Sequence, residues 1–219
     1  MTDWFPLWLS LRVSVIATLL AATLGVLVAY GLAKWRSRWS GLVEAVVTLP
    51  IVLPPTVLGY YLLTLLGTQS SVGQAWQSLF GAPLVFTEAG AVVAATVSAL
   101  PFVVRAARAA ISNVDPRIEE TARVMGLRET RVALWVTLPL ASRGIGAGIA
   151  LGFARALGDF GATVMVAGNI PGQTQTLPIA VYDAVQAGDD ATAQTGSLIL
   201  GAIAVVVLLL ITQVFARRP

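Results

Sequence analysis

The chain has 219 residues, of which 57% are hydrophobic and only 11% are charged, and its formal net charge is +3. This composition excludes an ordinary soluble globular protein and indicates a polytopic membrane protein, while the small net charge argues against a nucleic-acid-binding protein. Cysteine and histidine are both missing, which excludes disulfides, thiol chemistry and imidazole catalysis and predicts no metal site.

The first ten residues lack the positive charges of a cleaved signal, so the first apolar segment is expected to remain as a membrane helix. Lys34 is the only lysine and lies between Ala33 and Trp35, so the chain has no Walker A phosphate loop. Any ATP that powers this protein must therefore bind to another chain. No nucleophile–base motif predicts an intramembrane enzyme either.

Five segments are long and apolar enough to cross a hydrocarbon core of about 30 Å. The third segment can continue as a helix beyond the membrane to Asn113, and Gly148 and Gly152 in the fourth allow another helix to approach closely. Five helices are few for an enclosed pathway, so we expect at least two copies around one pore. The predicted spans are residues 9–33, 41–66, 89–104, 144–166 and 197–215.

The basic residues predict an external N-terminus and a cytoplasmic C-terminus. Of 14 lysines and arginines, all but Arg12 and Arg155 lie in or beside the predicted cytoplasmic segments, including the basic run at 34–38 and the pair Arg217 and Arg218. The predicted external loops, which we expect to carry short helices near residues 74–80 and 177–188, contain none. This distribution follows the positive-inside rule, and Arg12 is expected to reach the outer headgroups.

The second span contains three prolines, which predict a kink or a break near the middle of the membrane. Proline removes a backbone donor and clashes with the preceding turn. Broken membrane helices are tolerated where the freed backbone groups face protein or a water-filled cavity. The segment therefore either lines a pathway or has a kink that only helps packing. Its prolines and its polar pathway candidates are Pro50, Pro54, Pro55, Thr56 and Tyr60.

The fourth span carries the only opposite charges predicted inside the membrane, Arg155 and Asp159. They are four residues apart on one helix face, close enough to pair. An arginine that faces the pathway would attract a divalent oxyanion, with Asp159 tempering that attraction. Alternatively, the two charges form a structural pair, which is the interpretation the sequence favours. Thr163 and Asn169, nearer the outside, are comparable candidates for gate-lining positions.

Eight charged residues lie between Asp115 and Arg131, in a chain that is otherwise almost entirely apolar. Asp115 and Pro116 predict a helix start, and Gly126 predicts its end in a left-handed conformation. A second short helix is expected from residue 129 to residue 137, with Pro139 ending it. Considered alone, this helix–glycine–helix segment would by default be a solvated surface loop with ordinary charges.

The spacing in this segment resembles the cytoplasmic motif of binding-protein-dependent ABC transporter permeases. Every spacing of that motif is kept, although threonine replaces its first alanine and valine stands where isoleucine is usual. In that family the segment docks on a cytoplasmic ATPase and transmits its closure. The resemblance therefore implies an ATPase-coupling role for Glu119, Glu120, Thr121, Ala122, Gly126, Val136, Leu138 and Pro139.

The resemblance covers nearly the whole chain and narrows to permease subunits of molybdate transporters, with sulfate/thiosulfate permeases as the next most similar group. It rests on LPIVLPPTVLGYYLL and ARALGDFGATVMVAGNIPGQTQTLPIAVY. Asp159 stands where that family usually has glutamate. The resemblance implies an all-α type I importer permease, with residues 1–219 as one transmembrane domain and 115–139 as its coupling segment.

The same resemblance implies the partners of the chain. It predicts a homodimer in the bacterial cytoplasmic (inner) membrane, two ATPase subunits that bind ATP and Mg²⁺, and an external binding protein that delivers molybdate or tungstate. Transport would be import, and this chain would itself hold no cofactor. The alternatives are a sulfate/thiosulfate permease or a stand-alone transporter or channel. The latter would need its own ion-coupling carboxylates, for which only Glu44 and Asp159 are available.

Overall fold

The computed structural model describes residues 4–34 and 39–216, and those residues form helices and connecting loops. The predicted basic run at 35–38 and the pair Arg217 and Arg218 lie outside the described residues. The elements in chain order are α1 Phe5–Lys34, α2 Ser40–Val52, α3 Pro55–Leu66, α4 Ser71–Phe80, α5 Glu88–Ser112, α6 Pro116–Val124, α7 Glu129–Val132, the π-helix η1 Ala133–Thr137, α8 Leu138–Leu140, α9 Ser142–Leu157, α10 Gly161–Ala167, α11 Leu177–Gln186 and α12 Asp190–Ala216.

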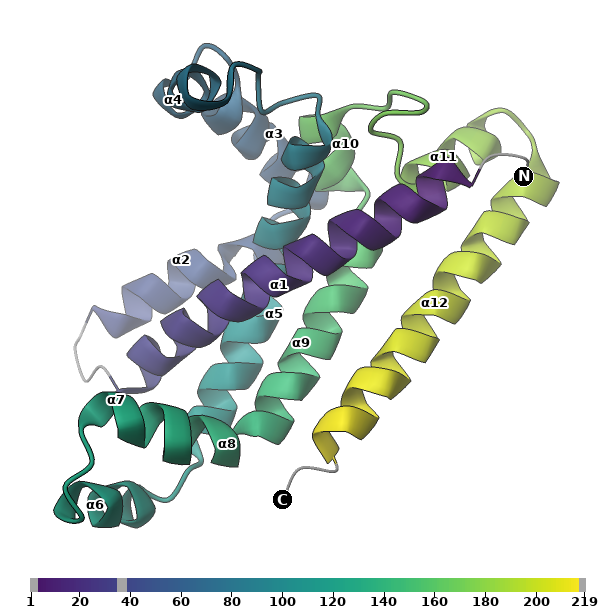
Figure 1. Cartoon of the computed structure of the whole chain (residues 1–219). Helices are drawn as coiled ribbons and strands as arrows, with labels where there is room; N and C mark the ends of the chain where they lie inside the picture. Colours follow the sequence, from purple (N-terminus) through teal and green to yellow (C-terminus); the bar gives the residue numbers. More distant parts are fainter. Residues whose placement is uncertain (1–3, 35–38, 217–219) are drawn as a thin grey trace.

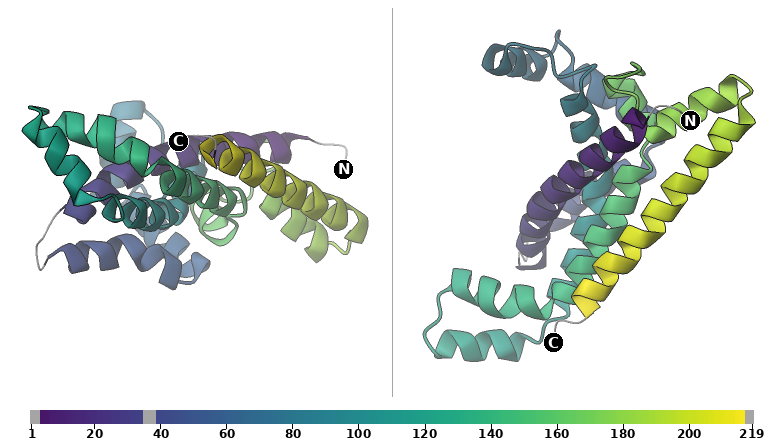
Figure 2. Two further views of the ribbon diagram at one scale, coloured as in Figure 1. Left: turned by 90° about the horizontal axis from the view of Figure 1, so that it is seen from below. Right: turned by 45° about the vertical axis from the view of Figure 1, so that its right-hand side comes forward.

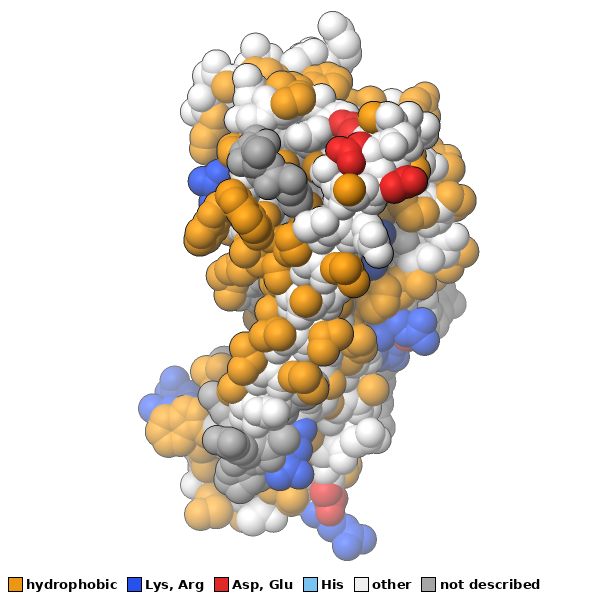
Figure 3. Space-filling view, turned by 90° about the vertical axis from the view of Figure 1, so that its right-hand side faces the viewer, with side chains coloured by type: hydrophobic (Ala, Val, Ile, Leu, Met, Phe, Trp, Pro, Cys, Tyr) orange, Lys and Arg blue, Asp and Glu red, His pale blue; other side chains and the backbone are white. Residues whose placement is uncertain are grey.

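By length and composition, three described helices can each cross a membrane alone, namely α1, α5 and α12, and bent helix pairs raise the number to as many as five. Helix α5 continues to Ser112, which confirms the predicted extension of the third span. Helix α12 begins earlier than expected because Asp189 caps it, accepting a hydrogen bond from the Thr192 N–H at 3.1 Å. Hydrophobic side chains cover the middle of the face that carries α12, as expected of a surface in contact with lipid (Figure 3).

The second span is broken at its prolines, as predicted. Helices α2 and α3 meet at an angle of 115°. Pro50 lies inside α2, while the extended Leu53 and Pro54 form the break and Pro55 starts α3. The first N–H groups of a helix have no partner within the helix, so proline is tolerated at a helix start, and the break places Pro55 at such a position.

The fourth span was expected to be continuous over residues 144–166, and this prediction is wrong. Helix α9 ends at Leu157, and α10 begins at Gly161 after a short non-helical connection. The cause is local: Gly158 ends the first helix, and Asp159 caps the second by accepting a hydrogen bond from the Thr163 N–H at 2.9 Å.

The core consists of α1, α5 and α9, which pack through small side chains. A Cβ added at Gly148 would lie 2.7 Å from the Ala106 Cβ, and one added at Gly152 would lie 2.9 Å from the Val103 Cγ2. Gly144, one turn earlier, is equally close to Ala110. The predicted glycine contact is therefore confirmed, and it joins α9 to α5.

The short helices gather at two opposite ends of the molecule. Helices α6, α7 and α8 lie at the same end as the last turn of α12, whereas α4, α11 and the first turn of α1 lie at the opposite end (Figure 1 and the right view of Figure 2). Arg12 was expected to extend to the headgroups, but its Nε pairs with the Glu88 Oε1 at 2.7 Å, tying α1 to α5. Arg108 pairs in the same way with Glu44 of α2.

Candidate functional site

The charged segment at 115–139 forms two short helical stretches around Gly126. The Asp115 carboxylate accepts a hydrogen bond from the Arg117 N–H at 2.9 Å and caps α6. Gly126 has φ +88°, the left-handed conformation predicted for it. The Leu127 N–H then donates to the Ala122 carbonyl at 3.1 Å and closes the end of α6. The predicted helix–glycine–helix arrangement is confirmed.

Pro139 was expected to end the second helix, and the structure corrects this. The helical path continues from α7 through η1 into α8, which ends at Leu140. Within it, the Leu138 N–H bonds to the Ala133 carbonyl five residues back. This wider turn makes room for the proline ring, which would clash in an ordinary α-helix. Pro139 therefore sits at the start of α8 rather than after its end.

Glu119 joins the segment to the first membrane helix. Its carboxylate is only 5% exposed and accepts hydrogen bonds from the Lys34 Nζ at 2.5 and 2.6 Å and from the Thr137 Oγ1 at 2.6 Å. Arg123, one turn further along α6, adds a contact at 3.6 Å. The last residue of α1, helix α6 and the π-helix thus meet at one carboxylate.

The surroundings of Glu119 change its acidity in opposing ways. Burial raises the pKa of the carboxyl, but hydrogen bonds from Lys34 and Thr137 and the charges of Lys34 and Arg123 outweigh it, so the pKa lies below its ordinary value of 4.5. A carboxyl with a lowered folded-state pKa stabilises the fold above its unfolded-state pKa and loses that contribution as the pH falls.

We therefore expect Glu119→Gln to loosen α6 from α1 at neutral pH by about 1–3 kcal/mol, the usual cost of losing a charged hydrogen bond. The wild-type protein should lose the same contact on acidification below about pH 4.5. Protease sensitivity of the segment between α5 and α9, followed against pH in detergent, measures both effects. If the Glu119→Gln variant and the wild type have the same acid profile, Glu119 is not the titrating group.

The other motif residues lie around this junction. Glu120 is exposed on α6, whereas Ala122 is buried and Val136 and Leu138 are partly buried. The Thr121 hydroxyl donates to the Arg117 carbonyl at 2.8 Å, so the threonine substitution costs no unpaired group. Sequence reasoning named Glu119 but missed its partners Lys34 and Thr137, because Lys34 lies 85 residues away along the chain.

Large apolar side chains point outward from the same segment. Val124, Met125 and Trp135 are 88%, 76% and 72% exposed, beside exposed Ile118 and Leu134. A soluble surface rarely carries such a group of apolar residues, and their concentration at one end of a protein marks a contact surface. The apolar residues of this stretch thus divide: Ala122 packs inward, while Ile118 and Met125 remain exposed.

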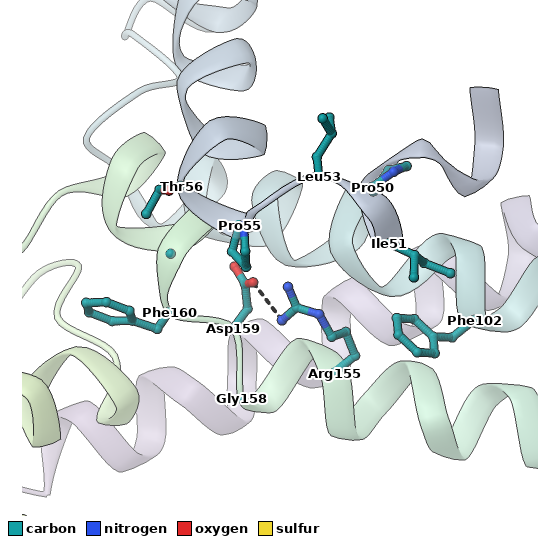
Figure 4. Close-up of a pocket in the computed structure, with 11 residues that line it drawn as sticks. Pro50, Ile51, Leu53, Pro55, Thr56, Phe102, Arg155, Gly158, Asp159 and Phe160 are labelled. Carbon is teal, nitrogen blue, oxygen red and sulfur yellow. Dashed lines mark ion pairs between the residues drawn. The ribbon is translucent and has the colours of Figure 1, made fainter. Parts of the chain in front are cut away.

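A cavity of about 400 Å³ lies where the break between α2 and α3 faces the connection between α9 and α10 (Figure 4). Such a volume falls within the range of roughly 300–1,000 Å³ that is typical of small-molecule sites. Helices α3 and α10 pack tightly beside it, since a Cβ added at Gly161 would lie 2.8 Å from the Pro55 Cβ. The lining comprises Pro50, Ile51, Leu53, Pro55, Thr56, Phe102, Arg155, Gly158, Asp159, Phe160 and Gly161.

The cavity brings together four of the predicted pathway residues: Pro55, Thr56, Arg155 and Asp159. The predicted ion pair is confirmed, with the Arg155 Nη1 lying 2.8 Å from the Asp159 Oδ1. Pro54 forms the adjacent break. Sequence reasoning missed the contribution of Phe102 and Phe160, since aromatic residues within a span are not distinctive.

The remaining candidates lie elsewhere. Tyr60 is exposed on α3 with its ring 6.0 Å from that of Tyr61. Thr163 is buried, and its hydroxyl donates to the Asp159 Oδ2 at 2.6 Å. The Asn169 side chain donates to the Asp183 Oδ2 at 2.7 Å, tying the connection after α10 to α11.

Comparison with known proteins finds close relatives along most of the chain. Residues 21–218 match the family described as "Binding-protein-dependent transport system inner membrane component". The molybdenum transport system permease protein ModB of Escherichia coli K12 is 38% identical over 98% of this chain and 94% of its own length. ModB of Haemophilus influenzae is 40% identical over 96% and 92%.

More distant similarities support the same fold. The inward-facing MetNI methionine ABC transporter includes a chain that superposes with a TM-score of 0.78 at 17% identity, with all of both chains covered. A probable sulfate transport system permease protein, cysT of Chlorokybus atmophyticus, is 31% identical over 89% of this chain and 66% of its own. The structure thus has the helical arrangement of a type I importer permease.

Proposed function

The chain belongs to the family of binding-protein-dependent transport system inner membrane components, and from this we propose that it carries molybdate or tungstate across the cytoplasmic membrane of a bacterium. It is the permease subunit of an ATP-driven importer. The ModB relatives, 38–40% identical over nearly the whole chain, support the substrate.

One observation supports the proposal that a partner ATPase drives transport through this protein. The segment at 115–139 combines exposed apolar side chains, among them Met125 and Trp135, with a buried carboxylate, Glu119, that ties it to α1. A partner that binds the exposed side can therefore move a membrane helix directly. We propose that this partner is a cytoplasmic ATPase, two copies of which bind the ATP and Mg²⁺ that this chain does not hold.

The proposed assembly follows from the same arrangement. The end with α6, α7 and α8 faces the cytoplasm together with the C-terminus, and the end with α4 and α11 faces an external binding protein. Helix α2 contributes no buried residue within the chain, which supports a homodimer in which a second copy covers the broken helix pair. Two copies then enclose the pathway.

The test is transport by the complete complex. The permease, reconstituted in liposomes with its ATPase and binding protein, should accumulate radioactive molybdate only when ATP and the loaded binding protein are on opposite sides of the membrane. Accumulation by the permease without the ATPase would instead establish a stand-alone transporter.

A sulfate/thiosulfate permease is the second candidate, favoured by the similarity to the sulfate relative. Tetrahedral dianions differ little in charge and shape, so the binding protein that delivers them decides the substrate. Calorimetric titration of that protein with molybdate, tungstate and sulfate separates the candidates. Micromolar sulfate binding without molybdate binding would overturn the molybdate assignment.

A further inference from the structure

The Arg155–Asp159 pair presents its two charges unequally. The Asp159 side chain is 0% exposed, while that of Arg155 is 24% exposed and lines the cavity. The carboxylate is also saturated: it accepts hydrogen bonds from the Ser98 Oγ at 3.2 Å and from both the N–H and the hydroxyl of Thr163. Asp159 therefore belongs to the scaffold, where it ties α5, α9 and α10 together.

Arg155 retains donors that the scaffold does not use. A guanidinium carries five N–H donors in a planar fork, and within the described residues the ion pair with Asp159 engages Nη1. The close-up shows one guanidinium nitrogen facing Asp159 along the dashed line, with the rest of the group lying in the space between Pro55 and Ile51 (Figure 4). The guanidinium of Arg155 is thus exposed to the cavity, whereas the carboxylate of Asp159, which neutralises its charge, is fully buried.

The apolar surroundings of Arg155 leave its positive charge weakly screened. Apart from the ion pair, Thr56 is the one polar side chain among the lining residues, and the rest are apolar or glycine. A charge is screened weakly in such a setting. Arg155 also lies thirteen residues after Ser142, the first residue of α9. This separation is a rise of about 20 Å along the helix axis from the end of α9 that follows α8. The position lies well inside the predicted fourth span, residues 144–166.

We propose that Arg155 is a transient binding site for a tetrahedral oxyanion in this cavity. The inference rests on the proposed function and adds a contact within the membrane. The guanidinium fork matches two oxygens of such an anion. Because Asp159 offsets the charge of Arg155, the pair as a whole is neutral, so the anion is attracted through the exposed donors but is not held. Sulfate and molybdate fit equally.

The local field can be tested without transport. Since the chain has no cysteine, Thr56→Cys introduces a single thiol into the cavity lining. In the complex, an anionic methanethiosulfonate reagent should modify this thiol roughly tenfold faster than a cationic one, because the Arg155 guanidinium is exposed to the cavity and the Asp159 carboxylate is not, so the local field favours an anion. Molybdate and sulfate should both slow the reaction. Adding Arg155→Gln should abolish the preference and the protection. Equal rates for the two reagents, or a preference that survives Arg155→Gln, would overturn the proposal.

Measurements of uptake distinguish anion binding by Arg155 from a purely structural role of its ion pair with Asp159. Arg155→Gln alone leaves Asp159 buried without its partner, so the double variant Arg155→Gln/Asp159→Asn is the informative one. If the pair is only structural, the neutral double variant recovers uptake. If Arg155 contacts the anion, uptake stays roughly tenfold below that of the wild type, the effect of one lost charged hydrogen bond, although the complex remains folded.

A matched control is the Arg12–Glu88 charge pair, which joins α1 to α5. Arg12→Gln/Glu88→Gln neutralises a pair with nearly the same separation, 2.7 Å, that lies outside the cavity, and it should retain uptake. Wild-type uptake checks the proposed function separately: without it the substrate assignment fails. Wild-type uptake with full activity in the Arg155→Gln/Asp159→Asn variant would refute only the anion site.

Discussion

Gly126→Pro should lower molybdate uptake by roughly tenfold or more while leaving the protein in the membrane. Gly126 has φ +88°, and proline, whose φ is fixed near −65°, cannot adopt that angle and costs about 3 kcal/mol or more where it is forced in. The end of α6 would open, and the exposed surface around Met125 would no longer match the ATPase. Uptake and ATPase co-purification, measured on the same membranes, follow both losses.

Gly126→Asn is the matched control. Asparagine adopts the left-handed conformation far more readily than other residues with a side chain, and a Cβ at this position meets nothing within 4 Å. The Gly126→Asn variant should therefore transport at nearly the wild-type rate. Equal uptake by the proline and asparagine variants would mean that the shape of this turn does not matter for coupling.

Gly148→Leu should have the largest effect on folding. The first atom of the new side chain would lie 2.7 Å from the Ala106 Cβ, and alanine has no rotamer through which to yield. Helices α5 and α9 must then separate, and overpacking of this kind costs about 1–3 kcal/mol or more. The expected result is a lower thermal unfolding midpoint in detergent and less folded protein on size exclusion.

Gly201→Leu controls for the size of the added side chain. Gly201 is exposed on α12, and a Cβ there meets nothing within 4 Å. This variant should keep the unfolding midpoint of the wild type. A loss of stability as large as that of the Gly148→Leu variant would show that the close contact between α5 and α9 is not the cause.

Local rules predicted much of this fold. Apolar length located the spans, prolines located the break between α2 and α3, and Gly126 marked the end of α6, because each of these effects acts within a few residues. The break between α9 and α10 was missed. Asp159 appears in the sequence as a membrane charge, and its role as a cap depends on Thr163 and on Ser98 of another helix.

The candidate site was predicted only in part for the same reason. The spacing of Arg155 and Asp159 predicted their ion pair, but which charge faces the cavity depends on how α5 and α10 pack around them. The contact between Lys34 and Glu119 joins the ends of two elements that no periodicity relates. The π-turn that makes room for Pro139 also places Thr137 beside them, and no helical period in the sequence indicates such a turn.

A cysteine cross-link can show whether an ATPase binds the segment at 115–139. Met125→Cys places a single thiol on the exposed side of the segment, and Leu79→Cys places one on exposed α4 at the opposite end. Treated with a short bifunctional thiol reagent in the assembled transporter, the Met125→Cys variant should cross-link to the ATPase and the Leu79→Cys variant should not. A cross-link to the ATPase from position 79 but not from position 125 would contradict both the docking surface and the proposed orientation.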